Sequence, residues 1–172
     1  MRSIILNLAL SLDGFIEGPN GEFDWCFTDQ DYGMTPFLSQ TDTILMGRRS
    51  YETLLGMGED HFPQHQKFVI SRNLETVEAP YRLLRGEGDD MAREIKAQAG
   101  KDIWLFGGAE LTTTLLEAGL VDEFMLAVHP LLLGSGKLLF PTLSKRIPLQ
   151  LQRAETFSSG LVQLFYRLAP AP

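Results

Sequence analysis

An apolar, strand-like run is followed by a glycine, two guanidinium groups and a hydroxyl in one short segment. Residues 44–46 form the apolar run, and Gly47, Arg48, Arg49 and Ser50 follow it. We predict that a strand ends at Gly47 and that a helix begins directly after it. The first turn of a helix carries unpaired backbone N–H groups and the positive end of the helix dipole, so it suits an anion such as a phosphate. Two arginines strengthen that site through charge-assisted hydrogen bonds.

The same pattern occurs a second time, with a pair of glycines in place of the arginines. Here the apolar run at 103–106 leads into the predicted start of another helix, and the candidate ligand contacts are Gly107, Gly108, Ala109, Glu110 and Leu111. Two glycines allow a ligand to approach the backbone closely. A third short strand, predicted over 67–71, ends at Ser71 and Arg72. Two phosphate-type sites in one small chain indicate a ligand with several phosphates, and a dinucleotide is preferred.

Two carboxylates are candidates for proton transfer. Asp13 follows the first predicted strand, at a sheet edge where α/β proteins gather their polar groups. Asp31 lies in a segment where it can face a cleft and supply a proton to a heterocycle. Each also has a structural alternative, because Asp13 precedes Gly14 as a turn former would and Asp31 can cap a helix. The sequence alone leaves these alternatives open.

Composition excludes several other classes of protein. The chain has 172 residues, a net charge of −7 and 44% hydrophobic residues, typical of an ordinary globular domain. An acidic protein lacks the basic face that general nucleic-acid binding or docking on an anionic membrane requires. No stretch approaches the roughly 18 apolar residues of a membrane-spanning helix. We therefore expect no nucleic-acid or membrane partner.

Cysteine and histidine usage predicts neither a disulfide nor a metal site. Cys26 is the single cysteine, which fits a reducing cytoplasm. His61 and His65 have the spacing of two ligands on a helix, but Pro63 between them disfavours a continuous helix. We expect no bound metal and a cytoplasmic location.

Strands alternate with helices along most of the chain, and a hairpin ends it. This order predicts an α/β fold with a mostly parallel central sheet flanked by helices and a C-terminal antiparallel hairpin. We expect one domain over residues 1–168 and a frayed tail over 169–172. The predicted strands are 3–10, 43–46, 67–71, 81–84, 103–106, 122–129, 149–157 and 161–168. The predicted helices are part of 29–40, then 49–55, 89–99 and 109–118, with Thr28 or Asp29 as the cap of the first.

The motifs resemble those of the dihydrofolate-reductase-like superfamily. Residues 44–52, 69–72 and 106–110 resemble, in order, three segments that bind NADPH in that superfamily, and 139–141 resembles a later Phe-Pro signature. The opening Ser-Leu-Asp-Gly at 11–14 is similar to that of the riboflavin-biosynthesis reductase domain, the RibD C-terminal type. The stand-alone relatives of that domain share the Asp24-Trp25 pair and are the group to which the chain is most similar.

The resemblance implies a dihydrofolate-reductase-like fold, NADPH as hydride donor, a small-molecule substrate and a homodimer. The implied activity is reduction of a pteridine- or pyrimidine-like heterocycle, related to the reduction of 5-amino-6-(5-phosphoribosylamino)uracil. Phe15, Trp25 and Phe27 are the candidate substrate contacts. The arginines, above all Arg48, Arg49 and Arg72, favour NADPH over NADH, because guanidinium groups grip a 2′-phosphate.

The sequence also departs from both named enzymes. Cys26 and Phe27 stand where folate reductases usually carry a tryptophan and a Leu-Pro segment, and Asn7 stands where the riboflavin enzyme usually has a lysine. The run that binds ribose phosphate in that enzyme is absent from the sequence. Dihydrofolate reduction and a non-catalytic NADPH-binding module therefore remain as alternatives.

Overall fold

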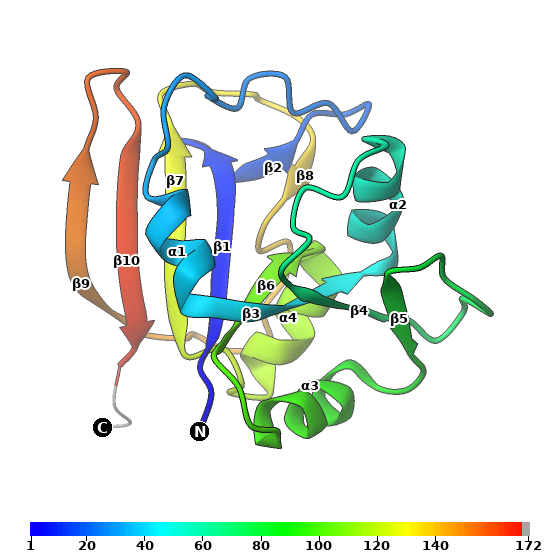
Figure 1. Cartoon of the computed structure of the whole chain (residues 1–172). Coiled ribbons are helices and arrows are strands. Elements are labelled where there is room, and N and C mark those ends of the chain that lie inside the picture. The colour runs from blue at the N-terminus through cyan, green and yellow to red at the C-terminus, as the bar shows by residue number, and fades with distance from the viewer. Residues whose placement is uncertain (170–172) are drawn as a thin grey trace.

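A central sheet of eight strands organises the chain. The structure is a computed structural model and describes residues 1–169. The strand order in the sheet is β5-β4-β3-β6-β1-β7-β10-β9, and a separate small sheet pairs β2 with β8 (Figure 1). The strands are β1 (Ile4–Ser11), β2 (Phe15–Glu17), β3 (Thr41–Gly47), β4 (Gln66–Ile70), β5 (Tyr81–Leu84), β6 (Asp102–Gly107), β7 (Glu123–His129), β8 (Lys137–Leu138), β9 (Leu149–Thr156) and β10 (Val162–Leu168).

The sheet is parallel from β5 to β7 and antiparallel from β7 to β9. Strand β1 lies at its centre, where Ile4 pairs with Ile103 of β6 and Leu6 pairs with Phe124 of β7. A parallel strand is covered on both faces, so its sequence is apolar almost throughout, as β1 shows. The predicted α/β fold, its mostly parallel sheet and its terminal hairpin are confirmed.

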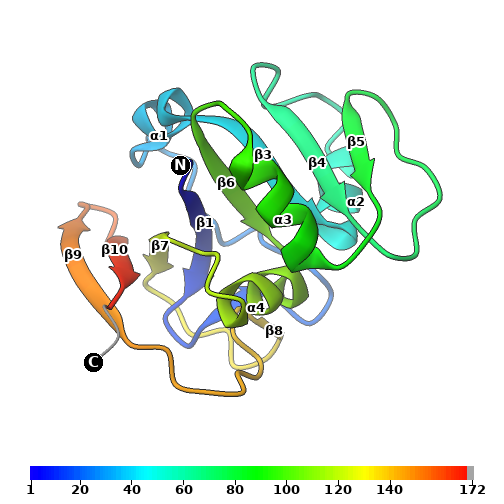
Figure 2. The same cartoon turned by 90° about the horizontal axis from the view of Figure 1, so that it is seen from below.

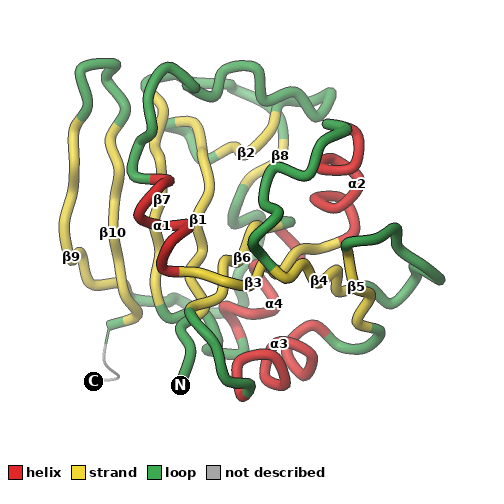
Figure 3. Tube along the Cα trace, in the orientation of Figure 1, coloured by secondary structure: helices red, strands yellow, loops and turns green. Residues whose placement is uncertain are grey.

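Helices cover both faces of the sheet (Figures 2 and 3). The helices are α1 (Met34–Gln40), α2 (Arg48–Gly56), α3 (Gly88–Ala97) and α4 (Ala109–Glu117). On one face, Ile95 of α3 and Leu115 of α4 pack in one core with Ile4 and Leu105. On the other face, α1 and α2 pack with Trp104 in a second core. No helix within residues 1–169 is long and apolar enough to cross a membrane.

The start of α1 differs from the prediction. The helix begins at Met34 after Gly33, which has a left-handed backbone (φ 75°), so neither Thr28 nor Asp29 caps it. Asp31 instead accepts hydrogen bonds from the N–H (3.0 Å) and hydroxyl (2.6 Å) of Thr35. A cap residue satisfies one specific backbone donor, and several polar residues within a few positions compete for that role. The predicted tail, 169–172, lies outside the described residues apart from Ala169, whose N–H bonds the carbonyl of Pro148.

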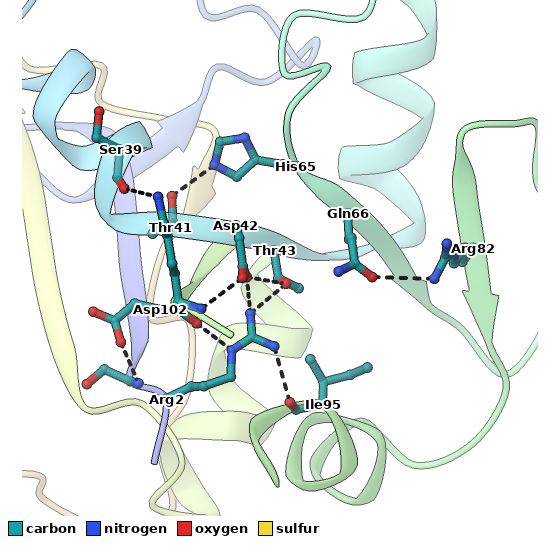
Figure 4. Close-up of polar contacts among 12 residues, drawn as sticks. Arg2, Ser39, Thr41, Asp42, Thr43, His65, Gln66, Arg82, Ile95 and Asp102 are labelled. Carbon is teal, nitrogen blue, oxygen red and sulfur yellow. Dashed lines mark hydrogen bonds and ion pairs between the residues drawn. The ribbon is translucent and has the colours of Figure 1, made fainter. Parts of the chain in front are cut away.

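Arg2 joins the strand ends opposite the two glycine-containing segments (Figure 4). Its guanidinium bonds the carboxylate of Asp42, the hydroxyl of Thr43 and the carbonyl of Lys101. The residue is 7% exposed, so these groups satisfy a charge that is nearly removed from water.

Replacement of Arg2 by alanine is expected to lower the free energy of unfolding by about 1.5–3 kcal/mol, the range for hydrogen bonds to a charged group. Urea titration followed by circular dichroism measures the change. Arg82→Ala, which removes an exposed arginine from β5, is the control and should alter stability by less than about 0.5 kcal/mol. Equal stability of both variants would contradict a structural role for Arg2.

Candidate functional site

Two adjoining cavities lie at the carboxyl ends of the parallel strands. The first, of about 340 Å³, is lined mainly by apolar side chains, and we call it the apolar cavity. The second, of about 300 Å³, is lined mainly by charged and backbone groups, and we call it the polar cavity. Arg49, Gly108 and Lys137 line both. An elongated ligand with one charged end and one flat, apolar end would therefore find a continuous site.

The polar cavity gathers the first turns of three helices. Gly47 and Arg48 lie at the start of α2, Gly88 at the start of α3, and Ala109 at the start of α4. None of these helices has a side-chain hydrogen bond at its N-cap. Their first N–H groups thus remain for solvent or a ligand, and their dipoles favour an anion. The other residues lining the polar cavity are Ile70, Ser71, Arg72, Asn73, Gly86, Glu87, Glu110, Leu111 and Thr114.

Basic side chains outnumber acidic ones on this wall. Arg48 pairs with Glu52 at 2.9 Å, and Arg72 lies 3.8 Å from Glu87. Both pairs are exposed and therefore weak, so a phosphate can compete for either arginine. Arg49 makes no ion pair within residues 1–169. The polar cavity is consequently a local cationic region in a chain of net charge −7.

The two glycines at the junction have backbone conformations that other residues rarely adopt. Gly107 has φ 117° and Gly108 has φ 79°, so a side chain at either position would be strained. A Cβ on Gly108 would lie 3.8 Å from Oγ of Ser50, on the first turn of α2. The junction is therefore a cradle of bare backbone between two helix N-termini, which a ligand could approach closely.

The sequence-predicted cofactor contacts come together here. Most of them line the polar cavity, and Ser50 and Gly107 line the adjoining apolar cavity. Neighbouring parallel strands end at the same edge of the sheet, so β3, β4 and β6 bring segments far apart in the sequence together. Contact between these residues and a cofactor stays a prediction.

Four small or amide-bearing residues from three strands of the large sheet form what we call the floor of the apolar cavity. Asn7 and Ala9 come from β1, Ala127 from β7 and Gln163 from β10. Gln163 is 2% exposed and donates from Nε2 to the carbonyl of Tyr32 at 2.9 Å, which fixes the orientation of the amide. Its Oε1 has no hydrogen-bond partner within the described residues. Sequence reasoning missed these amides, although a polar residue inside an apolar strand was a usable signal.

Around this floor, the wall of the apolar cavity is predominantly hydrophobic. Its other lining residues are Leu8, Ile16, Glu17, Phe23, Cys26, Phe27, Tyr32, Met34, Ser50, Thr53, Met57, Trp104, Phe106, Gly107, His129 and Leu161. Trp104 is 4% exposed, and its ring nitrogen donates to the carbonyl of Asn7 at 2.9 Å. The indole is thus fixed in the wall and can report optically on a ligand.

His129 is held in its neutral form. The backbone N–H of Phe27 donates to its Nε2 at 3.1 Å, so Nε2 must accept. Nδ1 then carries the hydrogen and donates to the carbonyl of Ala127 at 3.0 Å. Burial lowers the pKa of His129 below its ordinary value. An imidazole with both nitrogens bonded to the backbone positions the loop at Phe27 and is not free to deliver a proton.

Neither of the two predicted proton donors lines a cavity. Asp13 accepts hydrogen bonds from the hydroxyl of Ser11 (2.6 Å) and the N–H groups of Leu133 (3.1 Å) and Gly134 (2.8 Å). The hydrogen bond from Ser11, with those from the two N–H groups, holds the pKa of Asp13 below its ordinary value. Asp31 is exposed and bonds Thr35. Hydrogen bonds within the protein thus engage both carboxylates, and neither lines the two cavities, which disfavours the prediction of proton transfer by either.

Replacement of Asp13 by asparagine is expected to destabilise the protein at pH 7 and to have less effect in acid. A depressed carboxyl pKa contributes stability above the unfolded pKa of about 3.9, and that contribution is lost as pH falls through the lower folded pKa. Melting temperatures of both proteins between pH 7 and pH 3 measure the convergence. A constant difference across that range would show that the charge on Asp13 is not what anchors the loop.

The predicted substrate contacts are divided by the structure. Phe27 lines the apolar cavity, whereas Phe15 and Trp25 do not. Phe15 pairs with Leu138 in the small sheet, and the Trp25 ring packs edge-on against His129 with 5.2 Å between centroids. Trp25 therefore supports a residue of the wall, whereas Phe15 belongs to the small sheet. The path of a loop decides which way each aromatic ring points. A loop has no hydrophobic periodicity, so the sequence does not predict that path.

Cys26 lies on the cavity wall without the properties of a nucleophile. Burial, with the nearby charge of Asp24, raises the pKa of its thiol to about 11. The group is therefore protonated at neutral pH. Within residues 1–169, no cluster of three or more histidine, cysteine or acidic residues could hold a metal ion.

Comparisons with known proteins agree with this geometry. The family model of the RibD C-terminal domain matches residues 2–163. The chain is 44% identical to the Bacillus subtilis (strain 168) protein YyaP, over 96% of this chain and 94% of that protein. It is 32% identical to YwjB of the same organism, over 96% and 97% of the two chains. The chain belongs to the RibD C-terminal domain family.

Solved structures share the fold. A putative riboflavin biosynthesis protein from Shewanella sp. PV-4 superimposes with a TM-score of 0.88 at 24% identity, covering 99% of this chain and 100% of that one. The Thermotoga maritima deaminase/5-amino-6-(5-phosphoribosylamino)uracil reductase has a TM-score of 0.75 at 15% identity, and the match covers 98% of this chain but 57% of that one. Enterococcus faecalis dihydrofolate reductase, in complex with NADP(H), gives 0.73 at 15% identity, covering 98% and 97%. The fold is that of the dihydrofolate reductases.

Proposed function

We propose that the protein is an NADPH-dependent reductase of a small, flat heterocyclic substrate. The observation that carries the proposal is the continuity of a cationic cavity with an apolar one across a glycine cradle. NADPH has a matching distribution of charge, with a 2′-phosphate on its adenosine end, a diphosphate in the middle and a flat, uncharged dihydronicotinamide at the other end. The fold shared with a dihydrofolate reductase bound to NADP(H) supports the same assignment.

Each cavity has a distinct role in this proposal. Arg48, Arg49 and Arg72 would bind the phosphates, and the N-termini of α2 and α4 would hold the diphosphate beside Gly108. The apolar cavity would place the nicotinamide against the substrate and exclude water. The bound cofactor would supply hydride, and the protein would supply orientation and electrostatics.

The proton that the reduction requires would come from a water molecule beside Glu17. This residue is the one carboxylate among the residues that line the apolar cavity. Glu17 makes no ion pair or side-chain hydrogen bond within residues 1–169. It is half-buried, so it can exchange protons with solvent while facing the cavity. Sequence reasoning missed Glu17, because nothing in its neighbourhood distinguishes it from a surface residue.

Replacement of Glu17 by glutamine is expected to lower kcat about 100-fold, the lower range for general acid–base catalysis, because the water that donates the proton would lose the carboxylate beside it. The affinity for NADPH should stay within about twofold, because the change removes no phosphate contact. Steady-state kinetics and a binding titration separate the two effects. Glu155→Gln on β9 is the control, and an unchanged kcat in Glu17→Gln would remove Glu17 from proton delivery.

The test of the proposed function is a titration of the full chain with NADPH and NADH, followed by tryptophan fluorescence. We expect quenching, with a preference for NADPH of about 10- to 100-fold. Trp104→Phe should remove most of the signal and leave Trp25 as the remaining fluorophore. Absence of binding by either nucleotide would overturn the proposal. Tight binding without oxidation of NADPH by a broad panel of heterocycles would favour the non-catalytic alternative.

A homodimer and a cytoplasmic location are also part of the proposal. The resemblance to RibD-type reductases supports the dimer, and the single protonated thiol of Cys26 suits a reducing compartment. Analytical ultracentrifugation should give twice the chain mass of 19.3 kDa. Sedimentation at the monomer mass at micromolar concentration would contradict the dimer.

A further inference from the structure

The charges of the apolar cavity are concentrated at one end. Arg49, Lys137 and Glu17 carry the charged side chains of its wall, and His129 is held neutral by its two backbone hydrogen bonds. Arg49 and Lys137 also line the polar cavity, so they mark the junction between the two. Glu17 is paired with Lys137 in the small sheet, so it lies beside the junction as well, and the rest of the wall within the described residues carries no charged side chain.

This arrangement disfavours a phosphorylated substrate. A phosphate needs arginine, lysine or a cluster of N–H donors, and burying it without them carries a large free-energy cost. Under the proposed function, the two junction cations face the diphosphate of the cofactor. The remaining wall would present a substrate phosphate with apolar side chains such as Leu8, Phe23 and Met57.

The same wall disfavours a cationic substrate in its depth. Asp13 and Asp31 lie outside the cavity and are engaged in hydrogen bonds with the protein itself. The polar groups of the floor are uncharged amides, those of Asn7 and Gln163. The buried Oε1 of Gln163 lacks a donor within residues 1–169, so a ring that carries an N–H suits this floor.

We infer that the substrate is an uncharged, planar aromatic or heterocyclic compound that bears an N–H group and no phosphate. The inference rests on the proposed function and narrows its substrate class. It separates this chain from an enzyme that acts on a phosphoribosylated uracil, despite the shared fold. Specificity would come from the apolar wall and from the position of its two cations. These cations, Arg49 and Lys137, lie at the cofactor end.

A matched pair of fluorescent probes tests the charge selectivity of the cavity. N-phenyl-1-naphthylamine is an uncharged aromatic amine that carries an N–H, and 1-anilinonaphthalene-8-sulfonate is the same compound with a sulfonate. We expect the uncharged probe to bind the NADP⁺-loaded protein at least about tenfold more tightly, as measured by fluorescence enhancement. Equal or tighter binding of the sulfonate, or binding of neither probe, would overturn the inference.

Substitutions locate the probe and control for folding. Ala127→Phe fills the cavity floor and should weaken binding of the uncharged probe at least about tenfold, while thermal unfolding shows that the variant is folded. The same substitution at Ala154, an exposed position on β9, should leave probe binding unchanged. Retained probe binding in Ala127→Phe would place the probe elsewhere and count against the inference. Loss of NADPH binding in the unmodified chain would instead count against the proposed function.

A second arm uses the substrate of the related reductase with and without its phosphate. Oxidation of NADPH is measured with 5-amino-6-(5-phosphoribosylamino)uracil and with 5-amino-6-ribosylaminouracil, which lacks the phosphate but keeps the ribosylamino group that accepts the hydride. We expect the phosphorylated compound to show no higher kcat/KM than the unphosphorylated one. A preference for it of about tenfold or more, abolished in Lys137→Gln with unchanged NADPH affinity, would show that the junction serves a substrate phosphate and would overturn the inference.

Discussion

Replacement of Gly108 by valine is expected to lower the affinity for NADPH by at least about 100-fold, or roughly 2.7 kcal/mol. Gly108 is the N-cap of α4 and has φ 79° and ψ 129°, a combination that residues with a side chain rarely adopt. Valine would cost about 1–3 kcal/mol in backbone strain. It would also place its methyl groups at the junction of the two cavities, where the proposed diphosphate must approach the backbone.

Gly119 provides a matched control for the strain. It lies just beyond α4, has φ 68° and has nothing within 4 Å of the position of an added Cβ. Gly119→Val should therefore lower the melting temperature while leaving the affinity for NADPH within about twofold. Isothermal titration calorimetry on both variants measures this, with thermal unfolding alongside. If both variants bind NADPH as the unmodified chain does, the glycine cradle is not the cofactor site.

Removal of an arginine from the polar cavity is expected to abolish the preference for NADPH over NADH. Arg48→Ala and Arg72→Ala each remove a guanidinium that a 2′-phosphate can engage. We expect NADPH affinity to fall about 10- to 100-fold, which corresponds to about 1.4–2.8 kcal/mol. Because NADH lacks the 2′-phosphate, its affinity should change little. Tryptophan quenching by each nucleotide, in parallel titrations, measures the ratio.

The control for this effect is an arginine of similar exposure outside both cavities. Arg82 on β5 bonds Gln66 and lies over the ring of Phe68. Arg82→Ala removes one positive charge, as Arg48→Ala and Arg72→Ala do. The preference of Arg82→Ala for NADPH over NADH should equal that of the unmodified chain. Salt must be held constant, since the weak ion pairs of Arg48 and Arg72 are screened as ionic strength rises. Equal loss of NADPH and NADH binding in Arg72→Ala would assign that residue to a group common to both nucleotides.

Much of the fold followed from local patterns in the sequence. The apolar runs at 4–11 and 103–106 indicate buried parallel strands because both faces of such strands are covered. The glycines after the runs at 44–46 and 103–106 mark the turns into α2 and α4, and Gly119 marks the end of α4. These signals act between neighbouring residues, so they locate strands well. The observed bounds of β5 equal the predicted ones, and the bounds of most other predicted strands differ from the observed ones by one or two residues.

The proton donor and the substrate contacts were harder to predict from the sequence, because the residues concerned lie on loops or short strands. Asp13 and Asp31 had the residue type of a proton donor, but hydrogen bonds to Gly134 and Thr35 occupy them. Glu17 faces the apolar cavity because β2 pairs with β8, a contact between residues more than a hundred positions apart. No sequence window contains both partners of such a contact.

The sequence by itself determined the order of elements, the two glycine-containing turns and the arginines that follow the first of them. Those features depend on backbone sterics and hydrophobic periodicity, which act over a few residues. Only the tertiary structure decided that the two turns share one cradle and that the apolar cavity holds its cations at one end. Packing of the strands into a single sheet sets these distances, and packing depends on the whole chain.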